Sequence, residues 1–240
     1  AYDISFKHSD NVKALIGHTR HTTQGNCKNN QNNHPFLGKC KNAEFSLAHN
    51  GVLFNDADLK KKYNLPKSGI QTDSYIAVQL LEHKKELTPD SIKFMAENVQ
   101  GSFSFSILDD KNNIWLVKGD SPIEILRFPQ YSLIVYASTE VILWRALINT
   151  GLLEEIKAGR YERIPIEEGD ILNLTPTGAV EKYEFNYCDF SAVKSCNWWN
   201  YGIYGTGYEQ MYIEDLKAVA AYQGYSPEDI DELLENGFAP

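Results

Sequence analysis

Hydrophobic and polar residues alternate along much of this chain in a way that predicts short β-strands. Residues 102–108 read S-F-S-F-S-I-L, with an apolar side chain at every second position, and other segments are rich in β-branched and aromatic residues. The turn-forming string Pro176-Thr177-Gly178 lies between two such segments and indicates a hairpin. Strands, many of them antiparallel, are therefore expected at 43–49, 102–108, 114–117, 123–128, 133–137, 161–164, 170–174 and 179–185.

Three other segments, 74–84, 89–98 and 139–149, place their apolar residues on one helical face. Thr139 is expected to cap the third helix. Further along, 211–222 and 226–235 predict two short helices near the C-terminal end of the sequence. The pattern as a whole predicts a sheet-rich α+β body with a short helical tail.

Charge is distributed unevenly over the 240 residues, which carry 23 Lys and Arg against 32 Asp and Glu and a formal net charge of −9. Acidic residues concentrate in the last part of the sequence, which follows a stretch rich in glycine and aromatic residues. This indicates a body at 1–187, an aromatic and glycine-rich linker at 188–208 and an acidic helical tail at 209–240. Because no basic stripe and no long apolar run occurs, we expect neither nucleic acid nor a membrane as partner.

The four cysteines follow no structural zinc pattern and are too few for a disulfide scaffold at this length. Reduced thiols and a cytoplasmic location are expected, since the first residues do not resemble a signal peptide. Four histidines raise the question of a metal, but no H-x-x-x-H helix or carboxylate partner accompanies them; they are His18, His21, His34 and His49. We therefore expect neither a metal nor a cofactor, and the oligomeric state stays open.

Several polar residues suit chemistry on an amino acid. The guanidinium of Arg20 could bind a carboxylate in bidentate fashion, and Asp73 could hold an ammonium group. The side-chain amide of Asn50 beside the backbone N–H of Gly51 offers two donors for an oxyanion. Together these four residues favour amide or acyl chemistry on an α-amino acid.

Each of these residues also has a structural interpretation. Asp73 precedes a predicted helix and could be its N-cap. Asn50-Gly51 follows a predicted strand and could form a hairpin turn. Arg20 could belong to an ordinary ion pair. Spacing by itself does not decide between these interpretations and the chemical ones.

The order of short motifs resembles the glutaminase domain of the class II glutamine amidotransferases, a family of N-terminal-nucleophile hydrolases. The strings occur in the sequence G-H-T-R-x-x-T (17–23), N-x-H-P-F (32–36), A-H-N-G (48–51) and T-D before a helix (72–73). Three further strings, at 100–104, 119–122 and 137–140, continue the resemblance, which covers about 14–185. Each motif alone is weak, whereas seven in this order are specific.

The resemblance implies a four-layer αββα sandwich of antiparallel sheets and a site for glutamine. It assigns the α-carboxylate to Arg20 and the α-ammonium to Asp73, in agreement with the interpretation from residue chemistry. The other implied positions are Asn50 and Gly51 as the oxyanion donors, Thr23 and His34 near the glutamine pocket, and His21 at its wall. The implied reaction is hydrolysis of the glutamine side-chain amide to glutamate and ammonia, which a separate synthase chain could accept.

One feature departs from the family pattern. The nucleophile of these enzymes is a cysteine at residue one, with its own α-amino group as general base, whereas residue one of this chain is Ala1. Three explanations stay open: an upstream segment that begins with Cys, a pseudoenzyme that binds without cleaving, or an internal thiol such as Cys27. The alternative function is a catalytically inactive binding or scaffold protein that acts through amino-acid binding or its acidic tail.

Overall fold

The computed structural model describes residues 12–19, 29–148 and 150–188, together with Ser226, Glu228 and Asp231. The chain divides into two units, 1–189 and 190–240, and the first unit contains both of the sheets. The predicted linker and the tail with its two helices lie almost wholly outside the described residues, so these features and the boundary at 187 stay predictions. In the part of the chain that is described, no helix is both long enough and apolar enough to cross a membrane.

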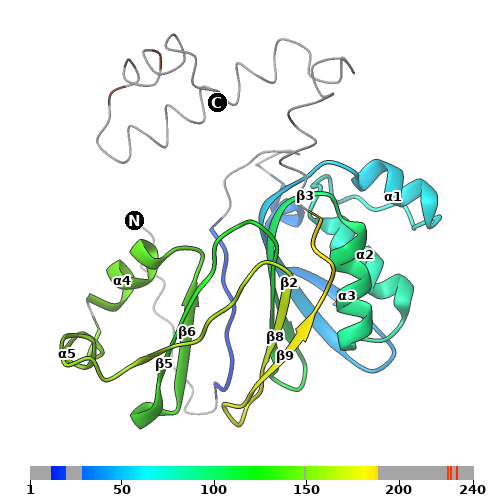
Figure 1. Cartoon of the computed structure of the whole chain (residues 1–240). Coiled ribbons are helices and arrows are strands. Elements are labelled where there is room, and N and C mark those ends of the chain that lie inside the picture. The colour runs from blue at the N-terminus through cyan, green and yellow to red at the C-terminus, as the bar shows by residue number, and fades with distance from the viewer. Residues whose placement is uncertain are drawn as a thin grey trace. The chain divides into compact units, whose positions relative to one another are not determined.

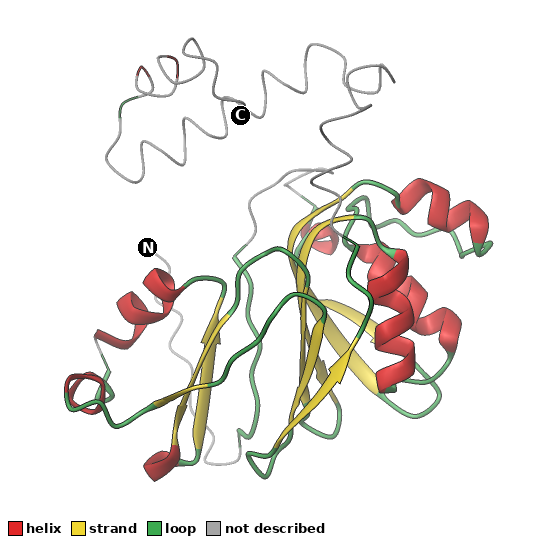
Figure 2. Cartoon of the chain, viewed as in Figure 1, coloured by secondary structure: helices red, strands yellow, loops and turns green. Residues whose placement is uncertain are grey.

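The strands of the described residues form two antiparallel sheets (Figure 1). Sheet A has the strand order β1-β2-β3-β4-β8-β9, and sheet B has the order β6-β5-β7. Figure 2 draws the strands in yellow. Every neighbouring pair in either sheet is antiparallel. The strands are β1 (Phe36–Lys39), β2 (Glu44–Leu53), β3 (Gly101–Asp109), β4 (Ile114–Lys118), β5 (Glu124–Phe128), β6 (Leu133–Ala137), β7 (Glu162–Arg163), β8 (Asp170–Leu174) and β9 (Val180–Glu184).

Helices cover the outer face of each sheet (Figure 1). Helices α2 and α3 pack on sheet A, and α4 and α5 lie on the far side of sheet B. The helices are α1 (Asp56–Lys62), α2 (Tyr75–Lys84), α3 (Pro89–Asn98), α4 (Glu140–Ile148) and α5 (Leu153–Lys157), with short 3-10 helices η1 (Asn30–Asn32) and η2 (Pro129–Tyr131). The order of layers is therefore helices, sheet A, sheet B, helices.

Strand alternation builds the three apolar interfaces between these four layers. Neighbouring side chains on a strand point to opposite faces, so Val117 of β4 packs under α2 and α3 while Leu116 packs between the sheets. On β5, Ile125 joins the layer between the sheets and Leu126 packs against α4. The period-two pattern of the sequence thus assigns each side chain of a strand to one of the two apolar interfaces on either side of its sheet.

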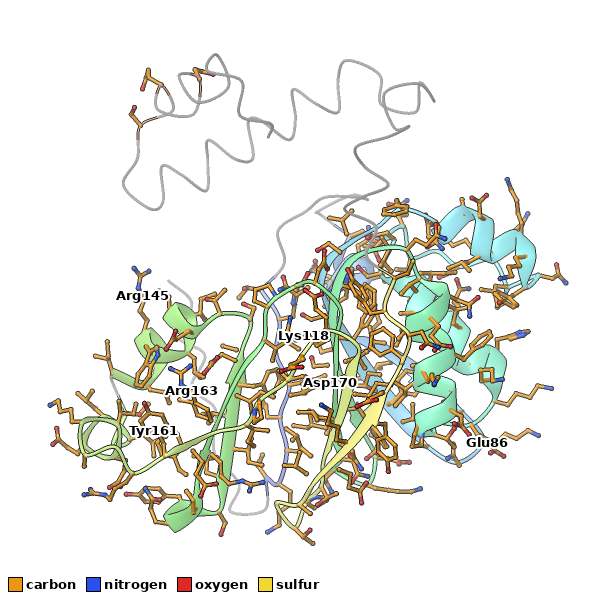
Figure 3. The ribbon with its side chains drawn as sticks, in the orientation of Figure 1. Glu86, Lys118, Arg145, Tyr161, Arg163 and Asp170 are labelled. Atoms are coloured by element: carbon orange, nitrogen blue, oxygen red, sulfur yellow. The ribbon has the colours of Figure 1, made fainter. Side chains whose placement is uncertain are left out.

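An ion-pair cluster connects sheet B to α4. The guanidinium of Arg163 in β7 pairs with Glu124 of β5 at 2.6 Å and with Glu140, the first residue of α4. Figure 3 labels Arg163 on this side of the fold, together with Arg145 of α4. Because the Arg163 and Glu140 side chains are about half exposed, the cluster fixes geometry more than it adds stability.

The prediction of an α+β fold with antiparallel sheets is confirmed. Every strand and helix expected between 43 and 185 is present, and the Thr139 hydroxyl accepts the Ile142 N–H at 3.3 Å as a helix cap. Besides the two 3-10 helices, one strand and two α-helices were not expected, namely β1, α1 and α5. Each is only four to seven residues long, and α1 buries a single apolar side chain, Leu59, so its helical pattern is weak.

Candidate functional site

The second half of β2 has an open edge. Strand β1 pairs with β2 only as far as Leu47, which lies opposite Phe36, so residues 48–53 have no neighbouring strand on that side among the described residues. On the other side, β3 pairs with β2 along its whole length from Phe45 to Leu53. A row of backbone groups of β2 is therefore directed away from the sheet.

The ladder determines which N–H groups point to that edge. Bonds from Phe54 N–H to the Gln100 carbonyl and from Asp110 N–H to the Glu44 carbonyl, both 3.0 Å, place the even-numbered residues in the hydrogen-bonded pairs. In an antiparallel ladder the intervening residues direct their N–H groups the opposite way. The odd-numbered residues of β2 therefore present their donors to the open edge.

Side chains from other segments accept two of these donors. The His49 N–H donates to Nδ1 of His34 at 3.4 Å, and the Leu53 N–H donates to Oδ2 of Asp73 at 2.6 Å. The Gly51 N–H lies between them on the same edge, and no described residue is placed by the ladder to accept it. The edge therefore combines the Gly51 backbone N–H with the carboxylate of Asp73, which follows Leu53 by 20 residues in the sequence.

Only glycine fits at position 51. Gly51 has φ +133°, and a Cβ atom there would overlap the Ser102 carbonyl oxygen and lie 2.9 Å from Cα of Phe103. Gly101, in β3, also has a positive φ, +139°, and meets the carbonyl of Val52 in the same way. The hairpin interpretation of Asn50-Gly51 is wrong, because β2 continues through both residues to Leu53 and two glycines allow the strands to approach closely.

The Asn50 side chain lies on the opposite face of β2 from the helices. Odd-numbered residues such as Leu47 pack in the apolar core under α2, so the even-numbered Asn50 faces sheet B. Its cross-strand neighbour is Ser104, which in turn lies opposite Lys118 of β4. Lys118, labelled in Figure 3, donates to the carbonyls of Gly119 at 3.3 Å and Ser121 at 3.4 Å. A row of polar residues therefore crosses three strands beside the Gly51 N–H.

Asp73 lies at the start of α2 but does not cap it. The N-cap residue is Ser74, whose side chain makes no capping bond, and the Asp73 carboxylate instead bonds to β2. Only 3% of Asp73 is exposed. Burial raises the pKa of Asp73, while the backbone N–H groups of Leu53 and Ser74 act in the opposite direction. The N-cap interpretation is therefore wrong, and the carboxylate is a buried acceptor at the β2 edge.

His49 and Ser74 form a buried hydrogen-bonded pair beside this carboxylate. His49 Nδ1 lies 2.8 Å from the Ser74 hydroxyl oxygen, and Nε2 lies 3.3 Å from the Ser102 carbonyl oxygen. Burial lowers the pKa of His49 to about 3, so the ring is neutral at physiological pH. Neither residue was predicted as a site residue from the sequence, although each is the immediate neighbour of a predicted one, Asn50 or Asp73.

His34 lies at the same end of β2, where it accepts from the His49 N–H. Its ring packs edge-on against Phe36 at 4.5 Å between centroids and tilted against His18 at 4.4 Å. Arg20, His21 and Thr23 lie outside the described residues, so their predicted roles stay predictions. The structure therefore brings four predicted site residues to one end of β2, namely His34, Asn50, Gly51 and Asp73.

Two further observations concern the chemistry at this site. The hydroxyl of Thr72, next to Asp73, is buried and has no hydrogen-bond partner among the described residues. Among those residues, no group of three or more His, Cys, Asp and Glu side chains could hold a metal ion. The site offers backbone and amide donors together with a carboxylate, a combination that can bind a zwitterion and stabilise an oxyanion.

The chain is similar in sequence to known glutamine amidotransferase domains. Residues 18–143 match the family described as glutamine amidotransferase domain. The chain is similar to the glutamine–fructose-6-phosphate aminotransferases (isomerizing) of Staphylococcus aureus and Staphylococcus epidermidis, at 36% and 33% identity over 114 residues. Each match covers 45% of this chain and 18% of the relative, so the chain matches less than a fifth of the relatives' length.

A solved structure shows the same fold. The glutamine phosphoribosylpyrophosphate amidotransferase from B. subtilis superimposes with a TM-score of 0.53 at 20% sequence identity. The superposition covers 70% of this chain and 34% of the other. At this identity the likeness establishes the architecture, an antiparallel two-sheet sandwich between helices, and nothing about the substrate.

Proposed function

Because the chain belongs to the family of class II glutamine amidotransferase domains, we propose that it binds glutamine at the open edge of β2 and acts in hydrolysis of the side-chain amide. The products would be glutamate and ammonia. The observation that carries the proposal is the alignment of the Gly51 N–H and the Asp73 carboxylate along one strand edge.

The spacing along this edge matches the length of glutamine. The Gly51 and Leu53 N–H groups are two residues apart on a strand, or about 7 Å, and Asp73 Oδ2 accepts from the second. In extended glutamine, five bonds and about 6 Å separate the α-nitrogen from the amide oxygen. One glutamine can therefore place its α-ammonium at Asp73 and its amide carbonyl at Gly51.

The proposed oxyanion site uses consecutive residues of β2. Attack on the amide carbonyl creates a negative oxygen, which the backbone N–H of Gly51 and the side-chain amide of Asn50 would stabilise. Both residues belong to a strand that β3 holds in register as far as Leu53, so the donors need little reorganisation during the reaction. In the same proposal Arg20 binds the α-carboxylate, Thr23 and His34 line the pocket, and His21 forms its wall.

The proposed nucleophile is a cysteine upstream of Ala1, as in the family that this chain belongs to. A described internal thiol is a poor substitute: Cys40 is buried, and burial raises its pKa to about 11. Cys188 is exposed, but as an internal residue it has no free α-amino group of its own to serve as general base. Ammonia would pass to an ammonia-accepting synthase.

Glutamine binding by single-residue variants tests the proposal. Asp73→Asn should weaken glutamine binding by about 3 kcal/mol, or roughly a hundredfold, because an amide cannot pair with the ammonium charge. Asp90→Asn is the matched control, since Asp90 is an exposed carboxylate in the first turn of another helix, α3. Titration calorimetry measures both, and wild-type affinity in Asp73→Asn would refute the assignment.

Turnover is measured separately on the product of the full natural gene. Release of one glutamate and one ammonia per glutamine would establish the reaction, and Asn50→Ala should then lower kcat roughly a hundredfold with little change in KM. Binding of glutamine without release of glutamate would instead identify a catalytically inactive amino-acid-binding protein.

A further inference from the structure

The hydrogen-bond geometry around His49 determines where the Ser74 proton lies. The Ser102 carbonyl oxygen can only accept, so His49 Nε2, at 3.3 Å from it, carries the ring hydrogen. Nδ1 of the neutral ring is then an acceptor, and the Ser74 hydroxyl at 2.8 Å donates to it. The imidazole therefore has one fixed tautomer.

This assignment has a consequence for Asp73. The Ser74 hydroxyl has two acceptors in reach, His49 Nδ1 at 2.8 Å and Asp73 Oδ1 at 3.4 Å. A hydroxyl has a single proton, and the shorter contact takes it. Oδ1 of Asp73 therefore faces the lone pairs of Ser74 instead of its hydrogen, and the two oxygens form a corner that can only accept hydrogen bonds.

We propose that His49 and Ser74 are a positioning pair that withholds the Ser74 proton from Asp73, so that Asp73 Oδ1 and Ser74 Oγ together accept the α-ammonium group of glutamine. This inference rests on the proposed function. An ammonium group has three donors and no acceptor, so a corner of two acceptors suits it. All three side chains are at least 96% buried, which strengthens such a hydrogen bond relative to one in water.

The corner also accounts for discrimination at this end of the ligand. A ligand without the amino group would leave two buried oxygens facing each other with no donor between them, which is unfavourable. Neither His49 nor Ser74 needs to change its charge for this role, because the neutral ring acts only by accepting one hydrogen bond. His49 would act through the direction of the Ser74 hydroxyl, and Ser74 by accepting a hydrogen bond from the ammonium group.

The experiment compares two ligands on wild type and three variants of the full chain. Glutamine and 4-carbamoylbutanoate, which is glutamine without its α-amino group, are titrated by calorimetry against wild type, Ser74→Ala, Ser74→Thr and Asp73→Asn. Ser74→Ala should weaken glutamine binding about tenfold and change binding of the deamino ligand less than twofold. Ser74→Thr keeps the hydroxyl and should bind glutamine within about threefold of wild type.

The outcomes separate this inference from the function on which it rests. Equal weakening of both ligands in Ser74→Ala, or unchanged glutamine binding there with loss in Asp73→Asn, overturns the positioning pair alone. A wild-type chain that binds neither ligand overturns the proposed function and the pair with it.

A readout without ligand tests the proton assignment directly. Long-range 15N–1H correlation spectra of the folded wild-type chain should show His49 as the neutral Nε2–H tautomer. Ser74→Ala should shift the Nδ1 resonance, because its donor is removed, and Ser74→Thr should restore it. Observation of the Nδ1–H tautomer in wild type would overturn the inference whatever the glutamine titrations show.

Discussion

Replacement of Gly51 by alanine tests whether close approach of β2 and β3 holds the proposed oxyanion donor in place. In Gly51→Ala the new Cβ would lie 2.6 Å from the Ser102 carbonyl carbon and 2.9 Å from Cα of Phe103. Carbon atoms in contact are about 3.5–4.0 Å apart, so the two strands would have to separate by roughly 1 Å. Both neighbours are backbone atoms, which cannot move aside by a side-chain rotation.

The expected loss of stability follows from two contributions. Separation of the strands would weaken the two hydrogen bonds of the Val52–Ser102 pair, each contributing about 1 kcal/mol. A non-glycine residue at φ +133° adds about 1–3 kcal/mol of backbone strain. Gly51→Ala should therefore lower the free energy of unfolding by about 3–5 kcal/mol, a large part of the roughly 5–15 kcal/mol typical of a folded domain.

Urea unfolding followed by tryptophan fluorescence measures this change. Trp115 is buried in β4 of the same sheet and should report on its unfolding. Gly151→Ala is the matched control, because no atom lies within 4 Å of a Cβ at that position, and its free energy of unfolding should change by less than about 1 kcal/mol. A loss below about 1 kcal/mol in Gly51→Ala would refute the argument that the backbone requires glycine.

Three further predictions concern buried groups. Burial raises the pKa of Asp73 above its unfolded value of 3.8, so the ionised carboxylate destabilises the fold at pH values above the folded pKa. Asp73→Asn should therefore be more stable than wild type at pH 8, and this gain should shrink as the pH falls through the folded pKa towards 3.8. A stability difference in urea unfolding that does not vary with pH would contradict this. Thr72→Val replaces a buried hydroxyl that has no hydrogen-bond partner among the described residues. The free energy of unfolding of this variant should therefore lie between the wild-type value and about 1 kcal/mol above it. A clear loss of stability in urea unfolding would show that the hydroxyl has a partner. Burial also raises the pKa of the Cys40 thiol to about 11, so iodoacetamide at pH 7.5 should label exposed Cys188 and leave Cys40 unlabelled until urea is added. Peptide mapping measures the labelling, and equal rates at the two cysteines of the folded chain would be inconsistent with a buried Cys40 thiol.

Local sequence patterns predicted most of the fold because each of them acts within one element. The S-F-S-F-S alternation of β3 requires only that successive side chains of a strand point to opposite faces, and the structure places the phenylalanines in one core as expected. Short elements with few buried residues, such as α1, escaped prediction because a single buried leucine sets no period.

The candidate site also has residues that the sequence could predict and residues that it could not. The motif strings predicted Asn50, Gly51 and Asp73 as site residues, since the chemistry of each residue type is known without its neighbours. Their structural alternatives, a hairpin turn and a helix cap, were equally readable and were decided only by the fold. Ser74 and His49 were missed because a serine and a buried histidine carry no signal until their partners are known.

The sequence by itself determined the alternation of apolar residues, the order of the family motifs and the residue types on which the proposed glutamine site depends. Only the tertiary structure decided that β1 pairs with β2 no further than Leu47, which leaves the rest of the β2 edge open, and that Asp73 bonds to Leu53 on that edge. The physical reason is that alternation fixes which face a side chain takes, whereas the direction of a backbone N–H and its partner depends on how distant strands pair.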